Sequence, residues 1–218
     1  MKFAGRNGLA RADRRRGLAP ENCILRAGFS VIELLVVAAI LVVLTTVMWG
    51  PASRNRQQTA LKACAQNLEK SYLALQVYAN DDAGKLPSTT NALTSEEPLS
   101  LLVPKYTADT SIFICPGSGD SALPSGAPFG NRRISYAYYM GQRLGGGQAP
   151  LMSDRQVNTL PKQAGDAVFS ATGKPPGNNH RKNGGNFLFG DGHVDMTPPE
   201  LSFSLVTTQG VVLLNPKP

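Results

Sequence analysis

The chain has 218 residues and a formal net charge of +7. Residues 1–28 hold seven basic and two acidic side chains, so the other 15 basic and 13 acidic side chains give the rest of the chain only about +2. Beyond residue 28 there is no Lys/Arg-rich stripe interleaved with aromatic residues, which excludes a nucleic-acid-binding protein on charge grounds. The length allows one modest globular domain.

An apolar run follows the basic segment. From Val31 to Trp49 the only charged side chain is Glu33. As a helix rising about 1.5 Å per residue, 29–49 would measure roughly 30 Å, the thickness of the bilayer hydrocarbon. The basic residues before it predict a cytoplasmic N-terminus by the positive-inside rule. We therefore predict a leader at 1–28, one span of the cytoplasmic membrane at 29–50, and an extracytoplasmic remainder.

The sequence Gly-Phe-Ser-Val-Ile-Glu at 28–33 resembles the processing site of type IV pilins and type II secretion pseudopilins. In that family a membrane peptidase cuts after the glycine and methylates the new amino terminus, and the fifth mature residue is glutamate. Those positions fall on Gly28, Phe29 and Glu33, while Ser30 stands where threonine is commoner. The resemblance implies three kinds of partner: the prepilin peptidase/N-methyltransferase, an inner-membrane assembly platform, and this and other pseudopilins in a helical filament.

A secretory signal or an uncleaved anchor would account for only part of the apolar run. An ordinary secretory signal has a shorter apolar core with its cleavage site after the core, and residues 47–51 offer no such site. An uncleaved signal anchor accounts for the span and the charge bias but not for Glu33. A carboxylate in the membrane needs a partner, and the free amine of Phe29 on a neighbouring subunit would neutralise it. The alternative is that Glu33 only reaches the headgroups.

Residues 51–84 continue as a predicted amphipathic helix. Pro51 predicts a kink rather than a stop if the helix runs through it. Gly84, with Pro87 just beyond, predicts the end of the helix. Apolar residues recur near helical spacing at Leu61, Cys64, Ala65, Leu68, Tyr72, Leu75, Val77 and Tyr78. This stripe needs a partner, so we expect one long helix, half in lipid and half packed on a small sheet.

The cysteines are consistent with an extracytoplasmic domain. Cys23 lies in the leader, which leaves Cys64 and Cys115. They are far apart in the sequence and lack CxxC or metal-ligand spacing. Translocation would permit a disulfide between them. Two buried free thiols are the alternative.

Residues 85–218 predict a small β-rich domain with long loops. Strands are expected at 111–115, 134–139 and 168–172. Residues 186–196 predict a hairpin that turns on Asp191-Gly192. Loops are expected at 116–130 and 140–150. The predicted fold class is therefore α+β, of the type IV pilin kind, with a long N-terminal helix packed on a small antiparallel sheet.

The predicted hairpin adds to the resemblance. His180, then ten residues, then Asp191-Gly192 is similar to the domain of prepilin-type proteins abundant in Planctomycetes, Verrucomicrobia and Lentisphaerae. In that pattern nine residues separate the histidine from Asp-Gly, so this chain departs from it by one.

The sequence gives only weak support for catalysis or metal binding in the predicted β-rich domain. Cys64, His180 and Asp191 are the residue types of a thiol hydrolase, and Cys115 would serve equally well as the nucleophile, but no activating motif accompanies them. His180, His193, Asp191 and Asp195 could gather around a metal. Some pseudopilins bind calcium, yet the twelve-residue acidic loop is absent here. Asp191 suits a turn, and His193 and Asp195 suit one exposed strand face. We expect no enzyme activity and no cofactor.

The sequence therefore predicts a structural subunit of a type II secretion pseudopilus or type IV pilus-like filament that supports protein secretion. The filament would form by heterologous contacts between identical hydrophobic helices, in the periplasm or at the cell surface. A pilin-like protein for DNA uptake or adhesion is the alternative. A membrane-tethered metal-binding domain is the third hypothesis.

Overall fold

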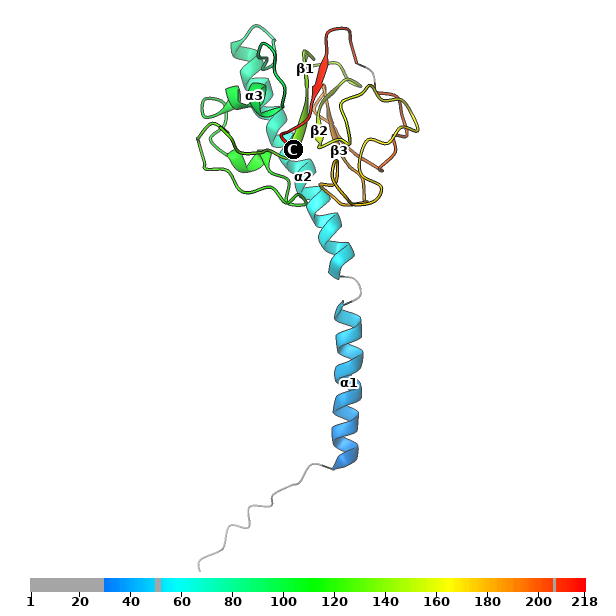
Figure 1. Cartoon of the computed structure of the whole chain (residues 1–218). Helices are drawn as coiled ribbons and strands as arrows, with labels where there is room; N and C mark the ends of the chain where they lie inside the picture. Colours follow the sequence, from blue (N-terminus) through cyan, green and yellow to red (C-terminus); the bar gives the residue numbers. More distant parts are fainter. Residues whose placement is uncertain (1–29, 50–51, 206) are drawn as a thin grey trace, which may run out of the picture. The chain divides into compact units, whose positions relative to one another are not determined.

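A computed structural model describes residues 30–49, 52–205 and 207–218, with backbone only at 47–49 and 52–54 (Figure 1). The chain divides into two units, residues 1–46 and 47–218. The second unit has mixed helices and an antiparallel sheet of five strands. The predicted α+β class is confirmed to this level.

The first unit contains most of helix α1, Val31–Trp49. Its sequence consists almost entirely of apolar residues, so the helix has no polar face. The predicted helix at 29–50 is thus observed over its described part. Phe29 and the predicted continuation through Pro51 lie outside the described residues.

Helix α2, Ala52–Asp81, carries the apolar stripe that the sequence predicts. Cys64, Leu68 and Leu75 are fully buried, while Val77 is half exposed and lies off the stripe. The helix ends in left-handed backbone at Ala83 as well as at the predicted cap, Gly84. The Gly84 amide donates to the carbonyl of Ala79, the six-to-one bond of a Schellman cap.

The sheet has the strand order β4-β3-β2-β1-β5, and every neighbouring pair is antiparallel. The strands are β1 Tyr136–Met140, β2 Pro150–Asp154, β3 Gly185–Phe189, β4 Val194–Thr197 and β5 Val212–Leu214. β1 confirms the strand predicted at 134–139 with slightly shifted bounds. β3 and β4 confirm the hairpin on Asp191-Gly192. β2 and β5 were not predicted.

Both faces of the sheet are covered. Leu68 and Leu75 of α2 pack in one cluster with Tyr136, Tyr138 and Leu188 of the sheet. The alternate strand residues point the other way, and their cluster contains Tyr139, Val168, Phe169, Phe187, Phe189 and Leu201. The loop that joins β2 to β3 supplies Val168 and Phe169, and its yellow trace lies on the right of the sheet in Figure 1. Loops therefore take the place of a second helical layer.

Two predicted strands are wrong. Residues 110–113 form the 3₁₀ helix η2, Thr110–Phe113, because the Asp109 carboxylate caps it by accepting hydrogen bonds from the Ser111 amide at 3.0 Å and hydroxyl at 2.5 Å. Residues 168–172 stay in a loop because the amides of Val168 and Phe169 share one carbonyl, that of Pro199, instead of forming a ladder.

Two short helices, α3 Glu96–Leu99 and η1 Ser100–Leu102, lie between α2 and η2 in the chain. Glu96 is buried, and its carboxylate accepts hydrogen bonds from the amides of Ile134 at 3.1 Å and Lys217 at 3.0 Å. The C-terminal segment is thereby attached to the start of the sheet.

Candidate functional site

The predicted processing site lies at the edge of the described chain. Gly28 and Phe29 are outside the described residues, whereas Glu33 lies in the first turn of α1. The Glu33 carboxylate accepts a hydrogen bond from the Ser30 amide at 3.4 Å, and the Ser30 carbonyl accepts from the Leu34 amide at 3.1 Å. This is the backward half of a capping box, Ser-x-x-Glu. Glu33 therefore has a local role in starting the helix.

The described side chains of α1 are exposed on every side. Val31 is 76% exposed, Leu34 67% and Leu41 56%. A soluble monomer seldom exposes so large an apolar surface, and such a surface marks contact with protein or lipid.

Among the residues that the structure describes, no helix combines the length and the apolar character that crossing a membrane requires.

Cys64 and Cys115 are joined by a disulfide, with an S–S distance of 2.06 Å and a Cα–Cα distance of 5.1 Å. Cys64 lies on α2, and Cys115 lies just after η2. The bond thus connects the long helix to the loop region that precedes the sheet. Both residues are almost fully buried.

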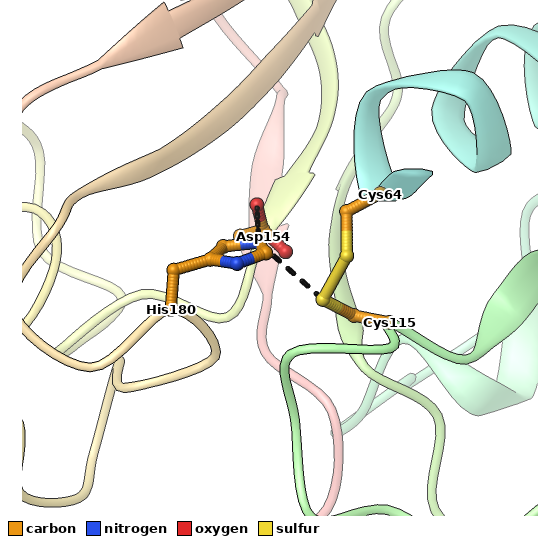
Figure 2. Close-up of side chains that lie close together, drawn as sticks. All are labelled: Cys64, Cys115, Asp154 and His180. Carbon is orange, nitrogen blue, oxygen red and sulfur yellow. Dashed lines mark hydrogen bonds and ion pairs between the residues drawn. A yellow bond between two sulfur atoms is a disulfide. The ribbon is translucent and has the colours of Figure 1, made fainter. Parts of the chain in front are cut away.

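A histidine and an aspartate lie against this disulfide (Figure 2). Nε2 of His180 is 3.3 Å from Sγ of Cys115 and 3.2 Å from Oδ2 of Asp154. Asp154 ends β2, and His180 comes from the loop before β3. Both side chains are completely buried. Nδ1 of His180 has no hydrogen-bond partner among the described residues.

Two asparagines hold the Asp154 carboxylate in place. Oδ1 accepts from the Asn179 side chain at 2.9 Å. Oδ2 accepts from the Asn186 amide at 2.8 Å and from its side chain at 3.0 Å. Burial raises the pKa of Tyr136, the cross-strand neighbour of Asp154, and the charge of Asp154 raises it further. The hydrogen bonds from Asn179 and Asn186 thus hold the Asp154 carboxylate from several directions.

The structure does not assemble the hydrolase residues that the sequence suggested. The Cys64 sulfur is bonded to Cys115, and the carboxylate beside His180 belongs to Asp154 rather than Asp191. The four residues that could have gathered around a metal are also divided, because His180 is buried whereas His193 is exposed in the β3–β4 turn. The structure therefore brings together neither of these two alternative groupings.

The exposed part of that group forms a small cluster on the hairpin. Nδ1 of His193 lies 2.5 Å from Asp191, and Nε2 lies 3.7 Å from Asp195. Desolvation acts to raise the pKa of Asp191, but hydrogen bonds from His193 and its nearby charge outweigh it, so the pKa is lowered. The His193 ring stacks on Phe189, with centroids 4.4 Å apart. Asp191 is a turn residue, as predicted, and His193 and Asp195 are exposed.

Gly192 brings the hairpin turn close to α2. Its φ is +94°, and an added Cβ would lie 2.6 Å from Cε1 of Tyr72 on the helix. The Tyr72 hydroxyl donates to the Gly190 carbonyl at 3.3 Å. The Asp-Gly dipeptide therefore serves both the turn and the contact between the hairpin and α2.

We expect Gly192→Ala to lower the free energy of unfolding by about 2 to 4 kcal/mol, because it adds overpacking against an aromatic ring to backbone strain. Urea unfolding followed by near-ultraviolet circular dichroism measures the loss. Gly165→Ala is the control for strain alone, since its φ is +89° and an added Cβ would meet nothing within 4 Å. Equal losses in the two variants would contradict the packing role of Gly192.

Sequence reasoning missed Asp154 altogether. The only signal was Ser153-Asp154 directly after Leu151-Met152, a polar pair that ends a short apolar run. The assembled cluster connects α2, the segment after η2, β2 and the β2–β3 loop through one disulfide and a set of buried hydrogen bonds. Comparisons of the chain with protein-family models, curated proteins and solved structures found no match.

Proposed function

We propose that the chain is a structural subunit of a type II secretion pseudopilus or type IV pilus-like filament, processed between Gly28 and Phe29. The observation that carries the proposal is the exposed apolar surface of α1, with Glu33 as its one charged side chain. A surface of this kind needs lipid before assembly and other helices after it.

The proposal gives Glu33 a partner as well as a cap. Cleavage after Gly28 would leave a positively charged amine on Phe29, four residues before the carboxylate. In a filament, the amine of one subunit would meet the Glu33 carboxylate of the next, and two charges in an apolar surrounding would neutralise each other. Because α1 has no other charged side chain, no other residue of the helix competes with Glu33 for the amine.

The second unit suits the proposed subunit because it is a small domain built on the helix that follows the apolar segment. α2 contributes one face of its core, and the disulfide joins α2 to the chain before the sheet. The proposed arrangement has a cytoplasmic leader, a membrane-inserted α1 and an extracytoplasmic domain that later lies in the filament. The proposed partners are the prepilin peptidase, the assembly platform and other pseudopilins.

Glu33→Gln separates the charge from the cap, because glutamine also closes a capping box. We expect normal cleavage and a filament yield reduced by about tenfold or more. The substitution leaves the amine of Phe29 without a carboxylate partner, and an unpaired charge within the membrane costs about 2.5 to 3.5 kcal/mol on the insertion scale. The measurement is the amount of subunit in sheared or cross-linked filaments relative to the total.

The matched control is Glu69→Gln, which makes the same change on the exposed face of α2 and should leave the yield unchanged. A filament yield of Glu33→Gln equal to that of Glu69→Gln would contradict the proposed pairing.

A further inference from the structure

The buried cluster of Figure 2 contains four residues that bind metals in other proteins. Cys64, Cys115, Asp154 and His180 each offer one ligand atom, and these four atoms lie within 4.8 Å of one another. They come from α2, the segment after η2, the end of β2 and the β2–β3 loop. The fold therefore brings two sulfurs, one imidazole and one carboxylate to one point.

The distances around His180 resemble those of a tetrahedral centre. Zinc bonds of about 2.3 Å to sulfur and about 2.0 to 2.1 Å to nitrogen and oxygen separate S from N by about 3.5 Å and N from O by about 3.4 Å. The structure has 3.3 Å from His180 to Cys115 and 3.2 Å from His180 to Asp154. The two sulfurs are bonded to each other and would have to separate to about 3.8 Å.

The surroundings of the cluster are built like the outer shell of a metal site. Asn179 and Asn186 orient the Asp154 carboxylate, as outer hydrogen bonds orient metal ligands. Gly117 makes room for the imidazole, because an added Cβ would lie 2.6 Å from Nδ1 of His180.

A disulfide alone does not explain the histidine and the aspartate. A disulfide has no need of polar neighbours, and burying an imidazole and a carboxylate costs free energy unless they gain strong interactions. A second state of the same residues, in which all four side chains act on one ion, accounts for their convergence.

We propose that the dithiol form of the chain binds one Zn²⁺ through Cys64, Cys115, His180 and Asp154, and that disulfide formation excludes the metal. In the dithiol form the two thiols lose their protons, and both thiolates with Nε2 and one carboxylate oxygen complete four-coordination. Oxidation joins the sulfurs and transfers two electrons to a disulfide oxidant, which takes up two protons from water and becomes a dithiol. Two of the four ligands are thereby lost, and Zn²⁺ is released. With four protein ligands the site is structural, without an open position for catalysis. The inference does not depend on filament assembly.

The test uses the full chain in detergent, reduced by a phosphine, which becomes the phosphine oxide as water supplies the oxygen and the two thiol protons. After anaerobic removal of the phosphine, Co²⁺ is added as a spectroscopic probe. We expect one equivalent to bind with thiolate-to-cobalt charge-transfer bands and tetrahedral visible bands, and Zn²⁺ to abolish both. The oxidised chain should show neither kind of band. Absence of the bands from the reduced chain would overturn the proposal.

Two variants separate this site from other metal binding. His193→Asn removes the exposed hairpin histidine and should leave the cobalt spectrum unchanged. His180→Ala should weaken cobalt binding by more than about tenfold and alter the visible bands, because three ligands remain. Far-ultraviolet circular dichroism checks that the variants are folded. A spectrum and affinity unaffected by His180→Ala in a folded chain would show binding to the thiols alone and contradict the site.

Discussion

Replacing Cys64 and Cys115 together by alanine should lower the free energy of unfolding of the globular domain by about 4 kcal/mol. The disulfide closes a loop of 51 residues, and the chain-entropy model gives that magnitude for a loop of this length. Because the bond connects α2 with the chain before the sheet, its loss frees two parts of the core from each other. Urea unfolding of the full chain in mild detergent, followed through the buried tyrosines, measures the change.

The chain supplies its own control in Cys23, which lies in the predicted leader and is not part of the disulfide. Cys23→Ala should leave the unfolding midpoint where it is. Treatment of the unaltered chain with a reductant, in the presence of a metal chelator, should reproduce the loss seen in the double variant. A double variant as stable as the Cys23 variant would show that the bond contributes nothing to the domain.

Asp154→Asn is expected to have an effect of similar size, a loss of about 3 to 5 kcal/mol in the free energy of unfolding. Asp154 is fully buried, and its two oxygens accept hydrogen bonds from Asn179 and Asn186 beside the His180 ring. Asparagine keeps the shape but replaces one oxygen by an amide nitrogen, so a donor then faces a donor. Breaking a buried, hydrogen-bonded pair by changing one partner carries a cost of this size.

Asp195→Asn makes the same chemical change on β4, where the side chain is 59% exposed, and should shift stability by less than about 0.5 kcal/mol. Chemical unfolding of both variants under the same conditions gives the comparison. If Asp154→Asn were as mild as Asp195→Asn, Asp154 would not be the centre of the buried cluster.

The sequence predicted well the β3–β4 hairpin and the buried face of α2, both of which local patterns decide. The Asp191-Gly192 turn predicted the β3–β4 hairpin because a turn of this kind sets the pairing of the residues on either side. The stripe of α2 predicted its buried face because helical periodicity follows from the backbone. The turn and the stripe can each be recognised within about ten to thirty adjacent residues, without knowledge of distant contacts.

One element decided by a local cap was predicted wrongly, and one decided by distant contacts was missed. Residues 111–115 have strand-like side chains, but Asp109 starts a 3₁₀ turn there. β2 ends in Ser153 and Asp154, two buried polar residues, and the Asp154 carboxylate accepts hydrogen bonds from Asn179 and Asn186, which lie far along the chain. No local pattern distinguishes such a strand from a surface segment.

The candidate site shows the same limit. Gly28, Phe29 and Glu33 form a local motif, so the sequence alone is enough to predict a processing site there, and this stays a prediction. The contact of His180 with Cys115 and Asp154 joins three segments separated by many residues. These residues have none of the short sequence spacings that mark a metal site. Only the assembled fold places them together.

The most direct test of the proposed filament subunit is the mass and N-terminal sequence of the membrane-extracted protein, made with and without the prepilin peptidase. The proposal predicts a chain that begins at a methylated Phe29 only when the peptidase is present, and that retains Met1 when it is absent. A chain that retains Met1 under both conditions would contradict processing, and with it the assignment of the chain to such a filament.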